Sequence, residues 1–114
     1  MKIFVSQPMN GRSREEVLRE RGLYLEAFKK WMYDNIIKDE ITRRACTFDI
    51  IENYDKPYAP ENAPRLWYLA DSLKLMSEAD YVIFVPGWRK AKGCKVEMMC
   101  CKLYDIRYVK MKRI

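Results

Sequence analysis

Short apolar runs alternate along the chain with longer segments whose apolar positions recur at helical spacing. Residues 2–6 are rich in β-branched and aromatic side chains and end in turn-forming residues, which predicts a short buried strand. Ser13 and Glu16 then have the spacing of a capping box, and apolar residues three and four positions apart continue to about Tyr33. The chain therefore opens with a predicted strand, a loop and a long helix.

The same alternation continues along the rest of the chain. Further strands are predicted at residues 47–51, 80–85 and 106–111. Further helices are predicted at residues 64–76 and 93–104. Residues 35–46 have no clear pattern, and the proline- and asparagine-containing residues 53–63 are predicted to form a surface loop. Alternating strands and helices form parallel α/β sheets, so we expect one small doubly wound sheet in a single domain over residues 1–114.

The composition supports a folded domain outside the membrane. The chain has 114 residues, of which 49% are apolar and 13% are aromatic, which is enough for a core and too much for a disordered chain. No apolar run approaches the roughly 18 residues that a transmembrane helix needs. The start, Met1–Val5, is too short for the apolar core of a signal peptide and is followed by polar residues. We therefore expect a soluble, cytoplasmic protein with no membrane partner.

The charge of the chain favours an anionic partner. Lysine and arginine number 22 against 16 aspartates and glutamates, a net charge of +6. A basic surface attracts phosphates, free nucleotides or nucleic acid. Nucleic acid is the least favoured of these, because the chain has neither a basic recognition helix nor a sheet motif with interleaved aromatic residues. We therefore expect a small-molecule partner.

Four cysteines and the absence of histidine restrict the chemistry. The cysteines, at positions 46, 94, 100 and 101, contain no C-x-x-C pair, so we expect reduced thiols and no metal site. Without histidine the chain cannot form a Ser-His or Cys-His nucleophile. Acid–base chemistry must therefore use carboxylates, tyrosines, lysines or thiols, and no cofactor is expected.

The loop after the first predicted strand is one place where a ligand could bind, because parallel sheets bind ligands at the carboxyl ends of their strands. The candidate substrate-binding residues of this loop are Ser6, Gln7, Pro8, Met9, Asn10, Gly11 and Arg12. Free backbone N–H groups and the Arg12 guanidinium suit a phosphate or another anion. The alternative is an ordinary strand-to-helix turn with a good cap. The loop is not a P-loop, because the G-x-x-x-x-G-K-[ST] spacing is absent.

The loop after residues 80–85 is the second such place. Gly87 belongs to a tight turn, Trp88 could stack on a planar base, and Gly93 opens the next predicted helix. Four basic residues lie between positions 89 and 95, and Glu97 follows in the first turns of the helix. We expect the helix dipole and these cations to favour the ionised form of Glu97, which could then attack the anomeric carbon of a sugar. The alternative is a solvent-facing glutamate that only stabilises the helix.

Three segments carry a resemblance to a known family. They are residues 2–11 (KIFVSQPMNG), residues 77–88 (SEADYVIFVPGW) and residues 93–97 (GCKVE). In this order, and over nearly the whole chain, they resemble the nucleoside 2-deoxyribosyltransferase-like family, most closely its short bacterial and phage branch. The resemblance implies a small flavodoxin-like (Rossmann-like) parallel sheet of four to five strands with flanking helices. It also implies cleavage or transfer at the N-glycosidic bond of a nucleoside or nucleoside 5′-monophosphate, with Glu97 as a nucleophile that forms a covalent glycosyl-enzyme.

The chain departs from the family's pattern near two of these motifs. Many relatives carry an aspartate eight residues before the position of Asp80, where this chain has Ser72, and Asp71 is the neighbouring residue. Either the helix is irregular by one residue, or Ser72 occupies the site and Asp71 points elsewhere, so both are catalytic candidates. Residues 89–92 contain no acid that could assist a departing base, as transferases of the family do. Hydrolysis, with water as the acceptor, and transfer to a second base therefore both stay open.

Other residues are predicted to be structural or are left open. Asp80 opens a strand at the edge of the sheet opposite to the expected site, and Met98 and Met99 should pack in the core or in a dimer interface. Aromatic residues that could line either a pocket or an interface are Tyr54, Tyr58 and Trp67. Large apolar residues on the helices, and sites that the family completes across subunits, predict a homodimer or a higher even-numbered oligomer. The alternative to an enzyme is a module that binds a nucleotide-like ligand without turnover.

Overall fold

Four parallel strands form one sheet in the computed structural model, which describes all of residues 1–114. The strands are β1 (Lys2–Ser6), β2 (Asp49–Ile50), β3 (Tyr81–Phe84) and β4 (Tyr108–Lys110). Their order in the sheet is β2-β1-β3-β4, and every neighbouring pair is parallel. This is the order of the first four strands of a flavodoxin-like sheet, so the predicted α/β class is confirmed.

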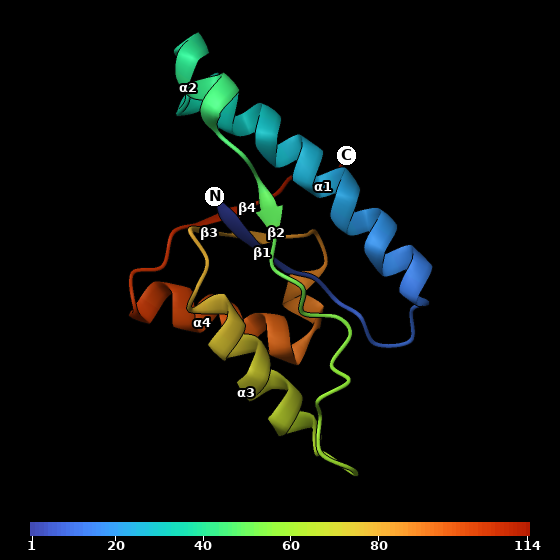
Figure 1. The fold of residues 1–114 in the computed structure, drawn as a ribbon. Coiled ribbons are helices and arrows are strands. Elements are labelled where there is room, and N and C mark those ends of the chain that lie inside the picture. The colour runs from blue at the N-terminus through green and yellow to red at the C-terminus, as the bar shows by residue number, and fades with distance from the viewer.

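Helices cover both faces of this sheet (Figure 1). They are α1 (Arg14–Asn35), α2 (Glu40–Ala45), α3 (Arg65–Met76) and α4 (Lys92–Leu103), with a short 3₁₀ turn, η1 (Trp88–Lys90), before α4. Helix α1 lies on one face, and α3 and α4 lie together on the other. Helix α2 follows the far end of α1 and buries none of its residues.

The period of two in the strands divides the core between the two faces. Ile3 and Val5 of β1 pack with Phe28 and the other buried apolar side chains of α1. Phe4 points to the opposite face and packs with Met98 and the neighbouring residues of α3 and α4. Because successive strand residues alternate in this way, Ser6 is directed toward α4 and Gln7 toward α1 at the end of β1.

Several predicted boundaries change in the structure. Strand β2 is shorter than the predicted strand at residues 47–51, and the unassigned residues 35–46 contain α2. The Ser13 cap is confirmed, because its Oγ accepts a 3.1 Å hydrogen bond from the Glu16 N–H. The return bond of a capping box does not form. The Glu16 carboxylate instead lies 3.9 Å from Arg12 Nε.

Asp80 has the structural role expected of it. Its Oδ2 accepts a 2.6 Å hydrogen bond from the Lys2 N–H at the amino edge of the sheet, away from the carboxyl ends of the strands. Among the helices, none has the length and the apolar character needed to cross a bilayer.

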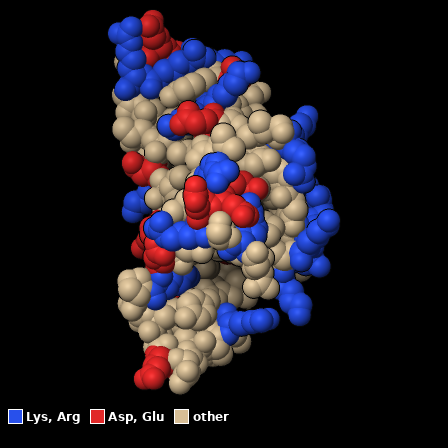
Figure 2. Space-filling view, turned by 90° about the vertical axis from the view of Figure 1, so that its right-hand side faces the viewer, with Lys and Arg blue, Asp and Glu red and all other residues tan.

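The carboxyl edge of the sheet is where the chain gathers its polar groups. The loops after β1 and β3 and the segment between β2 and α3 all lie on this edge, and α1 begins beside it (Figure 1). The sheet order reverses direction between β1 and β3, and such switch points are the usual ligand sites of open parallel sheets. Figure 2 looks onto this side of the molecule, where acidic and basic side chains intermingle across the middle.

Candidate functional site

Glu97 and Ser6 form the centre of the site. Glu97 lies on α4 and is only 6% exposed, and its Oε1 accepts a 2.7 Å hydrogen bond from Ser6 Oγ, which is also buried. No lysine or arginine nitrogen lies within 4.0 Å of the Glu97 carboxylate. The alternative of a solvent-facing glutamate is therefore wrong. The structure thus brings together a residue of the first predicted loop and a residue of the last predicted helix, at the switch point between β1 and β3.

The protonation of Glu97 differs from the sequence expectation. Burial raises the pKa of Glu97 from 4.5 to about 7, against smaller opposing effects of the Ser6 hydrogen bond and the charges of Lys56 and Arg21. The expectation that the helix dipole and residues 89–95 keep this carboxyl ionised is wrong. Those basic side chains are exposed to water, and the dipole acts mainly within the first turn, which Glu97 lies beyond. Near neutral pH the site therefore holds a carboxyl poised between its two forms.

Lys56 is a buried cation that the segment after β2 brings into the site. Its side chain is 5% exposed, and its Nζ donates to Ser72 Oγ at 2.8 Å and to the Tyr68 carbonyl at 3.1 Å. The Asp71 carboxylate lies 2.9 Å from the same Nζ and also accepts a hydrogen bond from Tyr58 Oη. These contacts hold the pKa of Asp71 below its usual range, with the Tyr58 bond the largest cause.

The two candidates on α3 have different positions. Helix α3 is regular from Arg65 to Met76, so it contains no one-residue irregularity. Ser72 is buried on the stripe that also carries Met76, while Asp71 lies on the rim. An open hollow beside Asp71 is lined by Tyr58, Trp67, Ala70, Asp71 and Lys74. Tyr58 and Trp67, which the sequence left between pocket and interface, therefore border a hollow next to the Lys56 contacts.

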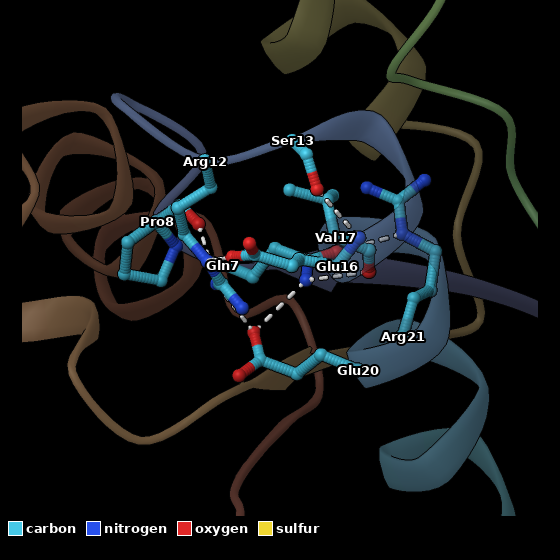
Figure 3. A network of polar contacts seen from close by, with 8 residues as sticks. All are labelled: Gln7, Pro8, Arg12, Ser13, Glu16, Val17, Glu20 and Arg21. Atoms are coloured by element: carbon cyan, nitrogen blue, oxygen red, sulfur yellow. Dashed lines mark hydrogen bonds and ion pairs between the residues drawn. The ribbon is translucent and has the colours of Figure 1, made fainter.

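Gln7 organises the other side of the site, below α1 (Figure 3). It is 2% exposed, and its Nε2 donates to the Val17 carbonyl and to Glu20 Oε1, both at 3.1 Å. These two bonds fix the amide so that its Oε1 accepts a 2.8 Å hydrogen bond from Arg21 Nε. Arg21 is also only 2% exposed, and its Nη1 and Nη2 have no hydrogen-bond partner.

Arg12 is already engaged within the first loop (Figure 3). Its Nη1 donates to Glu20 Oε1 at 2.8 Å and to the Pro8 carbonyl at 3.0 Å. Of the other predicted residues of this loop, Pro8 and Met9 are half-buried, and Asn10 and Gly11 are exposed. The loop is therefore closed by its own contacts, and the group that the sequence assigned to a phosphate is neutralised by an acid of α1.

The second predicted loop lies beside the site without turning its aromatic ring toward it. Gly87 has φ +96°, a left-handed conformation that few other residues adopt, and it ends β3 in a tight turn. The ring of Trp88 packs on Phe84, and the Arg89 guanidinium lies over it at 4.6 Å. A Cβ on Gly93 would lie 3.7 Å from Leu69 Cδ1, so Gly93 lies at the contact between α4 and α3.

The cysteines near the site are protonated thiols. Cys94 is buried beside Ser6, and burial raises its pKa to about 11. Cys101, one turn beyond Glu97, is buried as well, with its pKa raised to about 12. All four cysteines are free. Glu97, unlike these thiols, ionises near neutral pH.

The sequence reasoning missed three buried polar residues of the site: Arg21, Asn53 and Lys56. Arg21 left a signal, because it continues the buried stripe of Val17, Tyr24 and Phe28, where an apolar residue is expected. Asn53 and Lys56 belong to the irregular segment after β2 and had no periodicity to mark them. Only the folded segment directs Lys56 toward α3.

The same edge of the sheet thus carries a carboxyl that ionises near neutral pH and two buried cations, and an open hollow with aromatic walls lies beside Asp71. Such an arrangement can hold a polar ligand and place a carboxylate against it in surroundings with little water. Comparison of the chain with protein-family models, with curated proteins and with solved structures finds no match in any of the three.

Proposed function

We propose that the protein cleaves or transfers the N-glycosidic bond of a nucleoside or nucleoside 5′-monophosphate, with Glu97 as the nucleophile. The observation that carries this proposal is a buried glutamate that a serine hydroxyl orients and that no cation contacts. A carboxylate buried for stability alone would be paired, because an unpaired one costs free energy. The motif resemblance supplies the reaction class that such a carboxylate would serve.

The proposed reaction has two steps. In the first, a carboxylate oxygen of Glu97 attacks the anomeric carbon, the bond from that carbon to the base nitrogen breaks, and the electron pair leaves with the base, which takes up a proton. The product is a sugar ester of Glu97. In the second step, water or the nitrogen of another base attacks the same carbon and loses a proton. The ester bond then breaks, and the Glu97 carboxylate is restored.

The surrounding residues have separate tasks in this scheme. The Ser6 hydroxyl donates a hydrogen bond to Oε1 of Glu97 and so fixes the orientation of the carboxylate. The other oxygen, Oε2, has no hydrogen bond. Lys56 is the neighbour whose positive charge most favours the reactive, ionised form. Tyr58 and Trp67, with ring centroids 6.0 Å apart beside Asp71, offer aromatic surface for a base. Ser72 and Asp71 act through Lys56, which both contact.

The decisive experiment compares base release with ligand binding. The protein is incubated with a panel of nucleosides and nucleoside 5′-monophosphates, and free base is followed by chromatography. Glu97→Gln should lower base release by several orders of magnitude, because positioning cannot replace a lost nucleophile, while ligand binding survives. Glu61→Gln, at an exposed glutamate in the segment before α3, is the matched control and should retain full activity.

The same panel separates the enzyme from a binding module. If ligands bind to the wild-type protein but no base is released from any of them, the enzyme proposal is wrong and the binding module is favoured. If base release in Glu97→Gln equals that of the wild type, the glycosyl-enzyme mechanism is wrong. Adding a second base to the reaction distinguishes hydrolysis from transfer, because only transfer yields a new nucleoside.

We also propose that the protein assembles as a homodimer or a higher even-numbered oligomer. Support comes from large apolar side chains that α3 and α4 leave exposed, including Leu66 (72%), Met99 (58%) and Leu103 (68%). Light scattering at micromolar concentration should give at least twice the 13.7 kDa chain mass. A mass equal to that of the single chain would contradict this proposal.

A further inference from the structure

Arg21 is a buried cation whose two terminal nitrogens have no partner inside the protein. It is 2% exposed, only its Nε is hydrogen bonded, and no carboxylate lies within 4.0 Å of it. Burial is also the main reason that its pKa is lowered. Buried donors without partners cost free energy, and charged ones cost more. The fork of the Arg21 guanidinium, formed by Nη1 and Nη2, therefore costs the folded state free energy that contacts within the protein do not offset.

The fold does not need a charge at this position. Arg21 continues the stripe of α1 that packs on the sheet through Val17, Tyr24 and Phe28, and an apolar residue there would bury its side chain without penalty. Instead, Gln7 is fixed by Val17 and Glu20 and holds Arg21 Nε at 2.8 Å. Figure 3 shows Nη1 and Nη2 of Arg21 turned away from this network. The guanidinium is thus held in one orientation, with its fork free.

The free fork lies at the same edge of the sheet as Glu97. Ser6 binds Glu97 on the α4 side of β1, and the next residue, Gln7, binds Arg21 on the α1 side. The charge of Glu97 acts on Arg21, as does the stronger charge effect of Glu52. Asn53, which follows Glu52, is also buried, and its Oδ1 has no partner. Unpartnered donors of Arg21 and an unpartnered acceptor of Asn53 thus lie near the carboxyl ends of two neighbouring strands, β1 and β2.

A ligand can reach the fork if the segment after β2 moves. This segment starts beside β1, where the Ile51 N–H donates to the Ile3 carbonyl at 2.8 Å, and it reaches α1 at Asp55. The ion pair that ties it to α1 joins Arg14 to Asp55, and both side chains are about half exposed. Exposed ion pairs of this kind contribute little to stability, so this contact with α1 can open at low cost while Lys56 stays bound to α3.

We propose that the Arg21 fork anchors an oxyanion of the ligand, a phosphate or a carboxylate, while Glu97 acts on another part of the same molecule. A guanidinium fork matches the paired oxygens of both groups. Arg12 is the poorer anchor, because Glu20 already occupies its Nη1 at 2.8 Å. A hydroxyl of the same ligand can donate to Asn53 Oδ1. The inference rests on the proposed function only in placing the ligand at this edge of the sheet.

The test observes Arg21 itself in the ¹⁵N-labelled wild-type protein. Its buried, hydrogen-bonded Nε–Hε group should give a separate NMR signal, assigned by its loss in Arg21→Lys. Inorganic phosphate and acetate are titrated in turn, with chloride at matched ionic strength as the control. A saturable shift with phosphate or with acetate supports the inference and identifies which oxyanion binds. A signal that neither anion moves overturns it, whether or not the variant folds.

Two variants complete the test. In Arg21→Lys the affinity for the anion should fall at least about 10-fold, because the forked hydrogen bonds are lost while the charge is kept. The matched variant Arg19→Lys, at an exposed arginine of α1, should bind the anion as the wild type does, and an equal loss in both variants would overturn the inference. Glu97→Gln should bind the anion at least as well as the wild type. If the protein releases base but binds neither anion, the proposed function stands and the Arg21 anchor is wrong. If it binds an anion but releases no base, the anchor stands and the proposed function is wrong.

Discussion

Replacing Glu97 by glutamine should make the protein more stable, and only at high pH. The folded protein holds the pKa of Glu97 at about 7, against 4.5 for an ordinary glutamate, because burial penalises the charged form. Each pH unit of displacement corresponds to about 1.4 kcal/mol, so the folded state disfavours the ionised carboxyl by about 3 kcal/mol. Glutamine never ionises and retains the oxygen that accepts the Ser6 hydrogen bond.

The sign of the effect follows from proton binding. Between pH 4.5 and about 7 the folded state holds a proton on Glu97 that the unfolded chain has already released. Stability therefore falls as the pH rises through this window, and the loss is complete above the folded-state pKa. Below pH 4.5 both states are protonated and the wild type and Glu97→Gln should differ little. At about pH 8 the variant should be the more stable by about 3 kcal/mol.

Urea unfolding of the two proteins at pH 4.5 and at about pH 8 measures this difference. Carboxylates such as Asp55 and Asp71, whose pKa values are lowered by their partners, contribute equally to both proteins and cancel in the comparison. Glu61→Gln is the control and should leave the stability unchanged at both values. A stability gain in Glu97→Gln that is the same at both pH values, or a loss at the higher one, would refute the reasoning.

Three further predictions follow from burial and charge. Lys56→Met should raise the pKa of Glu97, because it removes the cation whose charge most favours the ionised carboxylate, whereas Lys95→Met, at an exposed lysine of α4, should leave that pKa unchanged. Carboxyl ¹³C NMR titration measures both. Met98→Ala should cost about 2–5 kcal/mol in urea unfolding because Met98 is 3% exposed. Ile41→Ala, at a side chain of α2 that is 82% exposed, should change stability by no more than about 0.5 kcal/mol, and equal losses would contradict the packing described above. A thiol reagent at about pH 8 should modify the two buried cysteines of α4 last, since burial raises their pKa values, and early reaction of either would contradict their burial.

Stabilisation by Glu97→Gln would separate function from folding. Replacing a residue that is retained for structure makes the protein less stable. A residue retained for chemistry can instead keep the stability of the protein below its maximum. Arg21 belongs to the same class, because its fork has no partner within the chain. Glu97 and Arg21 are buried, ionisable and both costly to stability, and they lie on the two sides of the end of β1. Their positions indicate a site that depends on charged groups.

The strands and long helices could be predicted because each has a pattern of apolar and capping residues within its own segment. Residues 2–6 and 80–85 are apolar runs between turn formers, and the apolar stripe of α1 follows Ser13, which caps the helix as predicted. Helix α2 could not be predicted in this way. It has no buried residue and hence no apolar period, and it starts at Asp39, whose Oδ1 accepts a 2.8 Å bond from the Thr42 N–H.

The sequence alone determined the class of the fold, the order of its strands and long helices, and the edge of the sheet at which Ser6 and Glu97 lie. Local patterns encode these features, because parallel strands bring their carboxyl ends to one edge. Only the tertiary structure decided the charge state of Glu97, since burial depends on everything packed around α4. It also decided which cations matter. The basic residues near Glu97 in the sequence are in water, and those that act on it, Lys56 and Arg21, come from distant segments. Electrostatic effects depend on distance and solvent exposure in three dimensions, and spacing along the chain specifies neither.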